Sequence, residues 1–202
     1  MKTIFIIEDH PIVMENLVSY FKDSGNWKVS GKASSLAAAK KEILKLTAKP
    51  DVLLLDIQLE DGWGLDIISW LKKKSFYKKN QFLIAVYTAF DDYGHVSAAM
   101  KLGVKAYITK TRSKQELEKA ILNALSGIVC IDENAQMKLN AVTNLLSLLT
   151  KREIDIFNLV KSGLSNKEIA SELGINFRTV ENVLSCVYDK TGVRSRKELE
   201  KL

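Results

Sequence analysis

Two short sequences, IFIIED at residues 4–9 and VLLLD at residues 52–56, each consist of an apolar run that ends on acidic residues. A run that is apolar at every position, such as Val52–Leu55, is typical of a strand covered on both faces, as in a parallel sheet between helices. In an open sheet of this kind, ligands bind beyond the carboxyl ends of the strands. The two sequences therefore predict a parallel sheet with acidic side chains at its ligand-binding edge.

The same arrangement recurs five times within residues 1–125. Short β-branched or aromatic runs predict strands, and longer amphipathic runs predict the helices that follow them. Five such repeats predict an α/β domain with a doubly wound, five-stranded parallel sheet and right-handed crossovers. The expected strands are Ile4–Ile7, Lys28–Lys32, Val52–Leu55, Phe82–Val86 and Ala106–Ile108, and the expected helices are Pro11–Phe21, Leu36–Leu46, Gly64–Lys73, Tyr93–Leu102 and Lys114–Leu125.

After residue 125 the strand pattern gives way to helical segments separated by short turns, with one short extended piece expected within Gly127–Ile131. This change of periodicity predicts three parts: a first domain at residues 1–126, a linker with a helix at 127–148, and an all-α domain at 149–202. The expected helices are Asn134–Leu149, Lys151–Lys161, Asn166–Leu173, Phe177–Lys190 and Ser195–Leu202.

The composition excludes several classes of protein. The chain has 202 residues, of which 47% are hydrophobic and 27% charged, as in ordinary globular proteins. Two cysteines cannot form a disulfide framework, and two histidines exclude most histidine-based metal and triad chemistry. No apolar run approaches the length of a membrane span, and the run at the N-terminus is too short for a signal peptide. A cytoplasmic protein with no membrane association is expected.

The net charge of +6 favours an anionic partner such as nucleic acid. Residues 1–126, however, contain 19 basic and 14 acidic residues, a net charge of +5, whereas residues 127–202 contain 11 and 10, a net charge of +1. Because the basic excess lies in the first domain, a prediction of nucleic-acid binding has to rest on the motifs of the helical part.

Five functional side chains follow strands of the predicted sheet. Glu8 and Asp9 end the first strand and Asp56 ends the third, and three converging carboxylates need a cation. Oxygen ligands together with a phosphoryl group suit Mg²⁺. Thr88 and Lys110, at two further strand ends, can contact the oxygens of a phosphoryl group. Asp56 is then a carboxylate nucleophile that forms an acyl phosphate.

His10 follows the acidic pair directly. It could be read as a phosphotransfer histidine, but we interpret it as a surface residue at the start of the first helix.

The second domain contains a helix, a glycine-containing turn and a second helix, which is helix-turn-helix geometry. Asn176 suits the N-cap of the second helix. Residues of this helix at spacings of three and four should face the core, namely Val180, Val183, Leu184 and Val187. The opposite face should be exposed to solvent or to a DNA groove.

Residues 1–125 resemble the receiver domain of two-component response regulators, which has a flavodoxin-like fold. The motifs that carry the resemblance are Glu8-Asp9, DIQLEDGWG at residues 56–64, Thr88-Ala89 and GVKAYITK at residues 103–110. It implies that Asp56 is phosphorylated, and that Glu8, Asp9, Asp56 and the Gln58 carbonyl bind Mg²⁺. Thr88 and Lys110 would contact the phosphate, and Tyr107 would move with Thr88. The chain departs from the family at Glu60 and Thr111, where proline is usual.

Residues 149–202 resemble the LuxR/NarL-type DNA-binding domain, through LTKRE at 149–153, GLSNKEIA at 163–170, Thr179-Val180 and TGVRSR at 191–196. The pairing implies a response regulator, not an enzyme, that a sensor histidine kinase phosphorylates and that binds double-stranded DNA, as a homodimer when phosphorylated, to control transcription. Thr179, Glu181, Asn182 and Ser185 would lie at the DNA. Its backbone contacts would come from Lys167, Arg178, Lys190, Arg194, Arg196 and Lys197.

Two other functions stay open at this point. The second helix of the motif has Glu181-Asn182 where the family usually has basic residues, so the protein could be a phosphorylation-responsive interaction module with weak or lost DNA binding. The acidic cluster could alternatively belong to a metal-dependent phosphatase or other enzyme.

Overall fold

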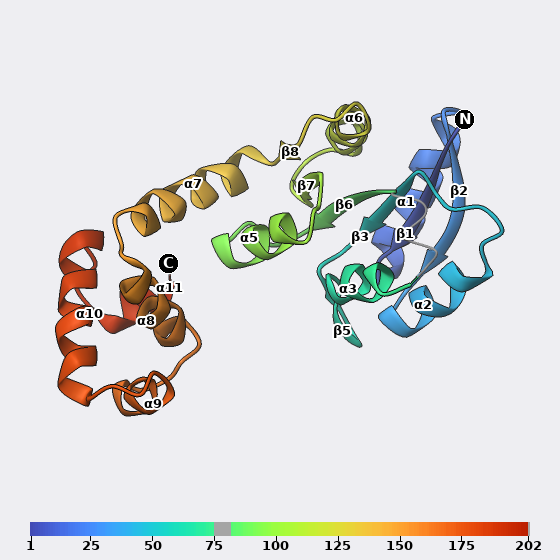
Figure 1. Cartoon of the computed structure of the whole chain (residues 1–202). Coiled ribbons are helices and arrows are strands. Elements are labelled where there is room, and N and C mark those ends of the chain that lie inside the picture. Colours follow the sequence, from blue (N-terminus) through green and yellow to red (C-terminus); the bar gives the residue numbers. More distant parts are fainter. Residues whose placement is uncertain (75–81, 202) are drawn as a thin grey trace. The chain divides into compact units, whose positions relative to one another are not determined.

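The computed structural model describes residues 1–74 and 82–201, and it divides into two compact units, Met1–Gln136 and Met137–Leu202 (Figure 1). The strands and helices of the first unit alternate as the sequence predicts. Its larger elements are β1 (Lys2–Ile7), α1 (Pro11–Asp23), β2 (Trp27–Ala33), α2 (Leu36–Lys45), β3 (Val52–Leu55), α3 (Asp66–Lys72), β6 (Leu83–Thr88), α5 (Tyr93–Lys101), β7 (Ala106–Thr109) and α6 (Lys114–Leu125).

The parallel sheet has the strand order β2-β1-β3-β6-β7-β8. The five predicted strands form its core in doubly wound order, which confirms the predicted fold class. The sixth strand, β8 (Cys130–Ile131), pairs in parallel with β7 at the edge. The extended piece expected after residue 125 thus belongs to the sheet, and this part of the predicted linker lies in the first unit.

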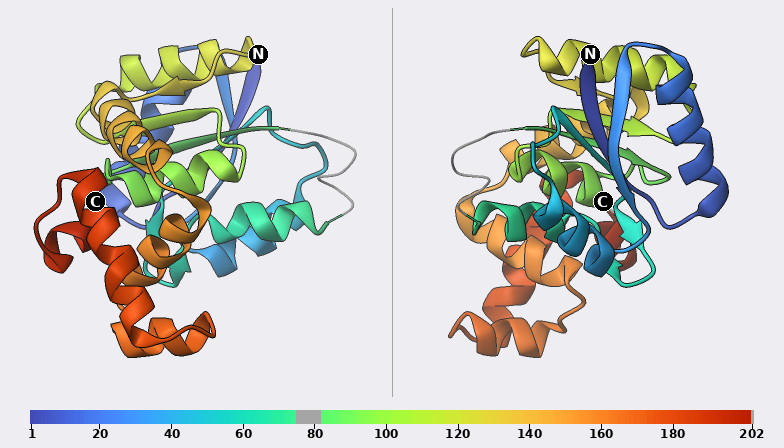
Figure 2. Two further views of the ribbon diagram at one scale, coloured as in Figure 1. Left: turned by 60° about the vertical axis from the view of Figure 1, so that its left-hand side comes forward. Right: turned by 90° about the vertical axis from the view of Figure 1, so that its right-hand side faces the viewer.

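Helices cover both faces of the sheet, with α1 and α6 on one face and α2, α3 and α5 on the other (Figures 1 and 2). Because side chains alternate along a strand, Ile4 and Ile6 of β1 face the core formed with α1 and α6. Phe5 and Ile7 are equally buried and point to the opposite face. This double coverage is the physical reason for strands that are apolar at every position.

Local capping determines where several helices begin. Ser113 and Glu116 form a reciprocal capping box at the start of α6, and Ser35 accepts a hydrogen bond from the amide of Ala38 at the start of α2.

A two-stranded hairpin, β4 (Gln58–Leu59) with β5 (Gly62–Trp63), follows β3 and was not predicted from sequence. Strands of two residues are too short to show periodicity.

Helix α7 (Glu133–Ser147) begins in the first unit and continues into the second. The second unit then contains α8 (Lys151–Lys161), α9 (Asn166–Glu172), α10 (Phe177–Thr191) and α11 (Arg196–Lys201). Its core is formed mainly by α8, α9 and α10, with Phe157, Ile169 and Leu184 among the buried residues. The all-helical prediction for this region is confirmed, although Leu202, the last residue of the final predicted helix, lies outside the described residues. No helix among the described residues has the length and apolarity needed to cross a lipid bilayer.

Candidate functional site

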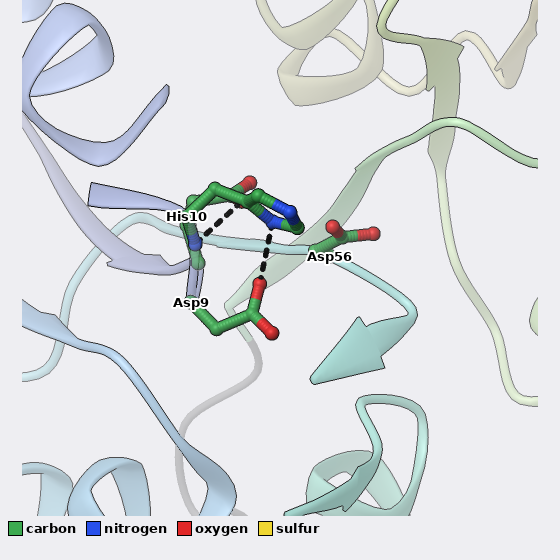
Figure 3. A group of neighbouring side chains, drawn as sticks. Asp9, His10 and Asp56 are labelled. Carbon is green, nitrogen blue, oxygen red and sulfur yellow. Dashed lines mark hydrogen bonds and ion pairs between the residues drawn. The ribbon is translucent and has the colours of Figure 1, made fainter. Parts of the chain in front are cut away.

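Three acidic side chains meet at the carboxyl edge of the sheet. Glu8 and Asp9 directly follow β1, and Asp56 directly follows β3, its neighbour in the sheet. Figure 3 shows the side chains of Asp9 and Asp56 beside that of His10. One side-chain ligand atom from each of Glu8, Asp9, His10 and Asp56 lies within 4.8 Å of the others. The sheet therefore brings together carboxylates that lie almost 50 residues apart in the sequence.

Lys110, which follows β7, neutralises part of this negative charge. Its Nζ lies 2.8 Å from Glu8 Oε2 and 2.7 Å from Asp56 Oδ2. Burial raises the pKa of Glu8 even though Lys110 contacts it. Burial of Lys110 favours its neutral form, but the hydrogen bonds to Asp56 and Glu8 outweigh this effect and raise its pKa. The ammonium is therefore held charged between the two carboxylates.

Asp56 has its two carboxylate oxygens in different environments. Oδ1 accepts a hydrogen bond from the backbone amide of Ile57 at 2.6 Å, and Oδ2 accepts one from Lys110 at 2.7 Å. Its side chain is only 6% exposed, but it lines a pocket that Asp9, His10 and Lys110 also line. The carboxylate is thus fixed in orientation and reachable from the pocket.

Thr88, at the end of β6, is fully buried. Among the described residues, its Oγ1 is the buried side-chain oxygen or nitrogen atom that has no hydrogen-bond partner. An unpaired buried hydroxyl is costly, and it suits a site that receives an oxygen-rich group. This orphaned hydroxyl, the ammonium of Lys110 and the carboxylates fit a bound metal ion and phosphoryl group.

The donor set also fits the expected magnesium ion. Carboxylates of Glu8, Asp9 and Asp56 offer oxygen ligands, the kind that Mg²⁺ prefers. Gln58, whose carbonyl is the other expected ligand, lies in β4 and lines the same pocket.

His10, interpreted from sequence as a surface residue, has a side chain that is 69% exposed, but its Nδ1 lies 2.9 Å from Asp9 Oδ1. Sequence reasoning missed this contact.

The loop that carries Gln58 is anchored at its turn and closely packed where it returns to the site. Asp61, at the turn of the hairpin, accepts hydrogen bonds from the backbone amides of Leu36 (2.8 Å) and Ala37 (2.9 Å) at the start of α2. A Cβ atom on Gly64 would overlap the carbonyl oxygen of Asp56, so the chain needs glycine where the hairpin returns to the site. The two hydrogen bonds tie the hairpin to the start of α2.

Tyr107, the expected switch residue in β7, is fully buried. Its hydroxyl donates a hydrogen bond to the carbonyl of Phe90 at 2.9 Å, and burial raises the pKa of this hydroxyl. Phe90 also lines the pocket beside Asp56. The tyrosine is therefore bonded directly to the segment that follows Thr88.

The second unit contains the expected helix-turn-helix, formed by α9 and α10. Asn176 accepts a hydrogen bond from the amide of Thr179 and caps α10, as expected, and Val180, Leu184 and Val187 face the core. Val183 is partly buried against the same core. The predicted DNA-facing residues of the motif are exposed, namely Lys167, Arg178, Thr179, Glu181, Asn182 and Ser185, and so are Arg194 and Lys197 beyond it.

Two predicted DNA contacts are engaged inside the unit. Lys190 Nζ lies 2.7 Å from Glu153 Oε2, so that the end of α10 is bound to the start of α8. Arg196 donates to Asn166 Oδ1 at 2.9 Å and to the carbonyl of Leu164. These two side chains hold the helices together, and neither partner could be predicted from sequence.

Comparison with protein families gives two matches. Residues 4–122 match the family described as "Response regulator receiver domain", and residues 147–201 match the family described as "Bacterial regulatory proteins, luxR family". Together the matches cover both units, in the order in which the site and the helix-turn-helix occur.

Two related proteins match this chain over more than nine-tenths of their own length. The chain is 28% identical over 200 residues to response regulator protein VraR of Staphylococcus aureus, which covers 96% of this chain and 92% of that protein. It is 26% identical to transcriptional regulatory protein YdfI of Bacillus subtilis, which covers 98% and 93%. Among solved structures, an RcsB–DNA complex matches with a TM-score of 0.70 at 22% identity and covers 98% of this chain and 96% of that one, which shows a common fold.

Proposed function

The chain belongs to the two-component response regulators, with a receiver domain followed by a LuxR-type DNA-binding domain, and we propose that a sensor histidine kinase phosphorylates it on Asp56. The observation that carries the proposal is the arrangement at the carboxyl edge of the sheet. A buried carboxylate lines a pocket together with Asp9 and the ammonium of Lys110, and the neighbouring strand ends on Thr88, a buried hydroxyl without a partner. It is a cytoplasmic response regulator in this proposal and acts as a transcription factor, not as an enzyme.

In the proposed reaction, a carboxylate oxygen of Asp56 attacks the phosphorus of a phosphohistidine. The P–O bond of an acyl phosphate forms as the P–N bond breaks, and the histidine leaves with a proton on its ring. When bound by Glu8, Asp9, Asp56 and the Gln58 carbonyl, Mg²⁺ supplies positive charge that stabilises the oxygens of the transferred group. Lys110 supplies a second positive charge, which is already in hydrogen-bond contact with Asp56.

The signal then passes through Thr88 and Tyr107. A phosphoryl oxygen gives the hydroxyl of Thr88 the partner that it lacks, and Thr88 moves toward it. The Tyr107 hydroxyl is bonded to Phe90, two residues after Thr88, so the tyrosine responds to that movement. The phosphoryl group thus favours one arrangement of this segment by differential contacts.

The second unit binds double-stranded DNA in this proposal, with α10 in the major groove. Arg178, Thr179, Asn182 and Ser185 of α10 are exposed and available for phosphates or base edges. Lys167 and Arg194 are further exposed candidates for backbone contacts. RcsB, which shares this fold, has been solved as dimers bound to DNA, and a homodimer of this chain when phosphorylated belongs to the proposal.

Labelling with a small phosphodonor tests the phosphorylation site. Acetyl phosphate that carries ³²P, with Mg²⁺, should label the wild-type chain and not the Asp56→Asn variant, because an amide is a poor nucleophile. The matched control is Asp51→Asn, an exposed aspartate of the same unit, which should be labelled as the wild type is. Equal labelling of the Asp56→Asn and wild-type chains would overturn the assignment.

One observation favours the alternative of a module with weak DNA binding. Glu181 is exposed on α10, whereas Lys190 and Arg196 are engaged within the unit. Affinity for a random duplex across a salt series separates the two functions. About four to six phosphate contacts give a slope of log affinity against log salt of roughly −4 to −5. A flat response would favour the interaction module.

A further inference from the structure

Two buried polar residues of the first unit take no part in the proposed phosphorylation chemistry. Thr109 is 4% exposed at the end of β7, and Asp132 is 4% exposed after β8. The hydroxyl of Thr109 donates to Asp132 Oδ2 at 2.8 Å. They lie one residue from Lys110 and one residue from the start of α7 (Glu133–Ser147), respectively.

Arg112 completes a clamp around Lys110. Its Nε donates to Asp132 Oδ2 at 2.8 Å, the same oxygen that accepts from Thr109. The backbone amide of Arg112 donates to the carbonyl of Thr109 at 3.0 Å, which closes a tight turn. Lys110 lies within this turn. The carboxylate of Asp132, which does not line the pocket, therefore contacts both ends of the turn that carries Lys110.

The same aspartate begins the helix that leads into the second unit. Oδ1 of Asp132 accepts a hydrogen bond from the amide of Asn134 at 3.1 Å, and its carbonyl accepts one from the amide of Gln136 at 2.8 Å. These two bonds are those of an N-cap residue. The amide of Asp132 also donates to the carbonyl of Tyr107 at 2.7 Å. Asp132 is thus hydrogen-bonded to Tyr107 of β7 through its backbone and to the Thr109–Arg112 turn through its side chain.

Charge holds this arrangement together. Burial favours the neutral form of Asp132, but hydrogen bonds from Arg112, Thr109 and Asn134 outweigh it and lower its pKa. The hydrogen bond that Arg112 donates to Asp132 raises the pKa of Arg112 in turn. Because a buried carboxylate without these donors is costly, the turn, the strand end and the helix start keep their positions together.

We propose that Asp132 is a positioning residue for phosphorylation: it fixes the Thr109–Arg112 turn that presents Lys110 to Asp56, and it couples this turn to the first turn of α7. The inference rests on the proposed phosphorylation of Asp56. Coupling between two sites is reciprocal. A phosphoryl group on Asp56 that contacts Lys110 therefore changes the stability of the first turn of α7, and a substitution at Asp132 changes the rate of phosphorylation.

The first experiment measures phosphorylation of the full-length chain by acetyl phosphate in three variants. Asp132→Ser keeps a residue that can cap α7 but removes the carboxylate that Arg112 contacts. Arg112→Gln removes the positive charge of Arg112. Thr109→Val removes the hydroxyl that donates to Asp132. At saturating Mg²⁺, each of the first two should lower the rate constant by about tenfold, the effect of a lost hydrogen bond to a charged group. Thr109→Val should show a smaller loss.

Controls separate positioning from a general loss of structure. Glu116→Gln removes the other carboxylate near Arg112, 3.7 Å away, and should leave the rate unchanged because the bond to Asp132 remains. The Mg²⁺ concentration that gives half of the maximal rate should not rise in any variant, because Lys110 contacts the proposed metal ligands Glu8 and Asp56 and its displacement leaves their negative charge to the metal. The double variant Asp132→Ser/Arg112→Gln should be no slower than the slower single variant. If Asp132→Ser does not fold, Arg112→Gln and Thr109→Val still test the clamp.

The second experiment tests the reciprocal effect by hydrogen exchange. Beryllofluoride with Mg²⁺, as a stand-in for the phosphoryl group, should change the exchange rates of the Asn134 and Gln136 amides by severalfold in the wild type and leave them unchanged in Arg112→Gln. Unchanged exchange in the wild type, although calorimetry shows that beryllofluoride has bound, would overturn the coupling. Wild-type phosphorylation rates in both charge variants would overturn the positioning role. A wild-type chain that acetyl phosphate does not label at Asp56 would instead refute the proposed function.

Discussion

Replacement of Lys110 by methionine tests the electrostatics of the site directly. The side chains of Glu8 and Asp56 are 2% and 6% exposed, and the Lys110 ammonium lies within 2.8 Å of both. Without it, two buried carboxylates face one another. Breaking a buried ion pair typically costs 3–5 kcal/mol, and we expect a loss at the lower end, about 3 kcal/mol, because Lys110 is 19% exposed. For a unit of this size the loss lowers the melting temperature by roughly 10 °C.

The assay is thermal unfolding in EDTA, followed by tryptophan fluorescence. All three tryptophans lie in the first unit, so the signal reports that unit alone. Lys105→Met, at an exposed position just before the same strand, is the matched control and should melt as the wild type does. The loss should be smaller at pH 5 than at pH 8. Burial raises the pKa of Glu8, and its protonation at the lower pH removes one of the two facing charges.

Addition of Mg²⁺ provides the second half of the test. The ion replaces the positive charge that the variant lacks, so it should raise the melting temperature of Lys110→Met more than that of the wild type. Equal melting temperatures of the two proteins in EDTA, or an equal rise with Mg²⁺, would refute the reasoning that Lys110 balances the buried carboxylates.

Three further predictions concern other parts of the chain. Gly64→Ala should lower the free energy of unfolding in urea by at least about 2 kcal/mol, because its Cβ would overlap the carbonyl of Asp56. The hydrogen bond from Lys190 lowers the pKa of Glu153 from its usual 4.5 to about 2. The stability that Glu153 contributes is therefore present at neutral pH and is lost as the pH falls from about 4.5 to 2. The rates of hydrogen exchange in α8 should differ between the wild type and Lys190→Met at neutral pH and become equal near pH 2. Arg178→Ala should weaken DNA binding about equally across sequences and reduce the salt slope by about one, as measured by fluorescence anisotropy.

Much of the fold could be predicted because its signals are local. Val52–Leu55 is apolar at every position and forms β3, a strand buried on both faces. The helix Lys114–Leu125 has the bounds that its periodicity and the Ser113 cap predict. The hairpin formed by β4 and β5 was missed, because two-residue strands leave no periodic pattern and pair only when the flanking chain brings them together.

The candidate site divides in the same way. The residue types at the strand ends, Glu8, Asp9, Asp56, Thr88 and Lys110, could be selected from sequence, because parallel strands place their carboxyl ends at one edge. The side-chain partners could not. Lys110 binds Glu8 across 102 positions of sequence.

The sequence by itself determined the order of strands and helices, the division into a sheet domain and a helical domain, and the residues at the carboxyl edge. These follow from periodicity, caps and composition, which act over a few residues. Only the tertiary structure decided which charges are paired: that Lys190 and Arg196 hold the helices of the second unit, and that Asp132 joins the Lys110 turn to α7. A charged side chain takes the partner that strand order and helix packing bring within about 3 Å, and its own sequence neighbourhood does not specify that partner.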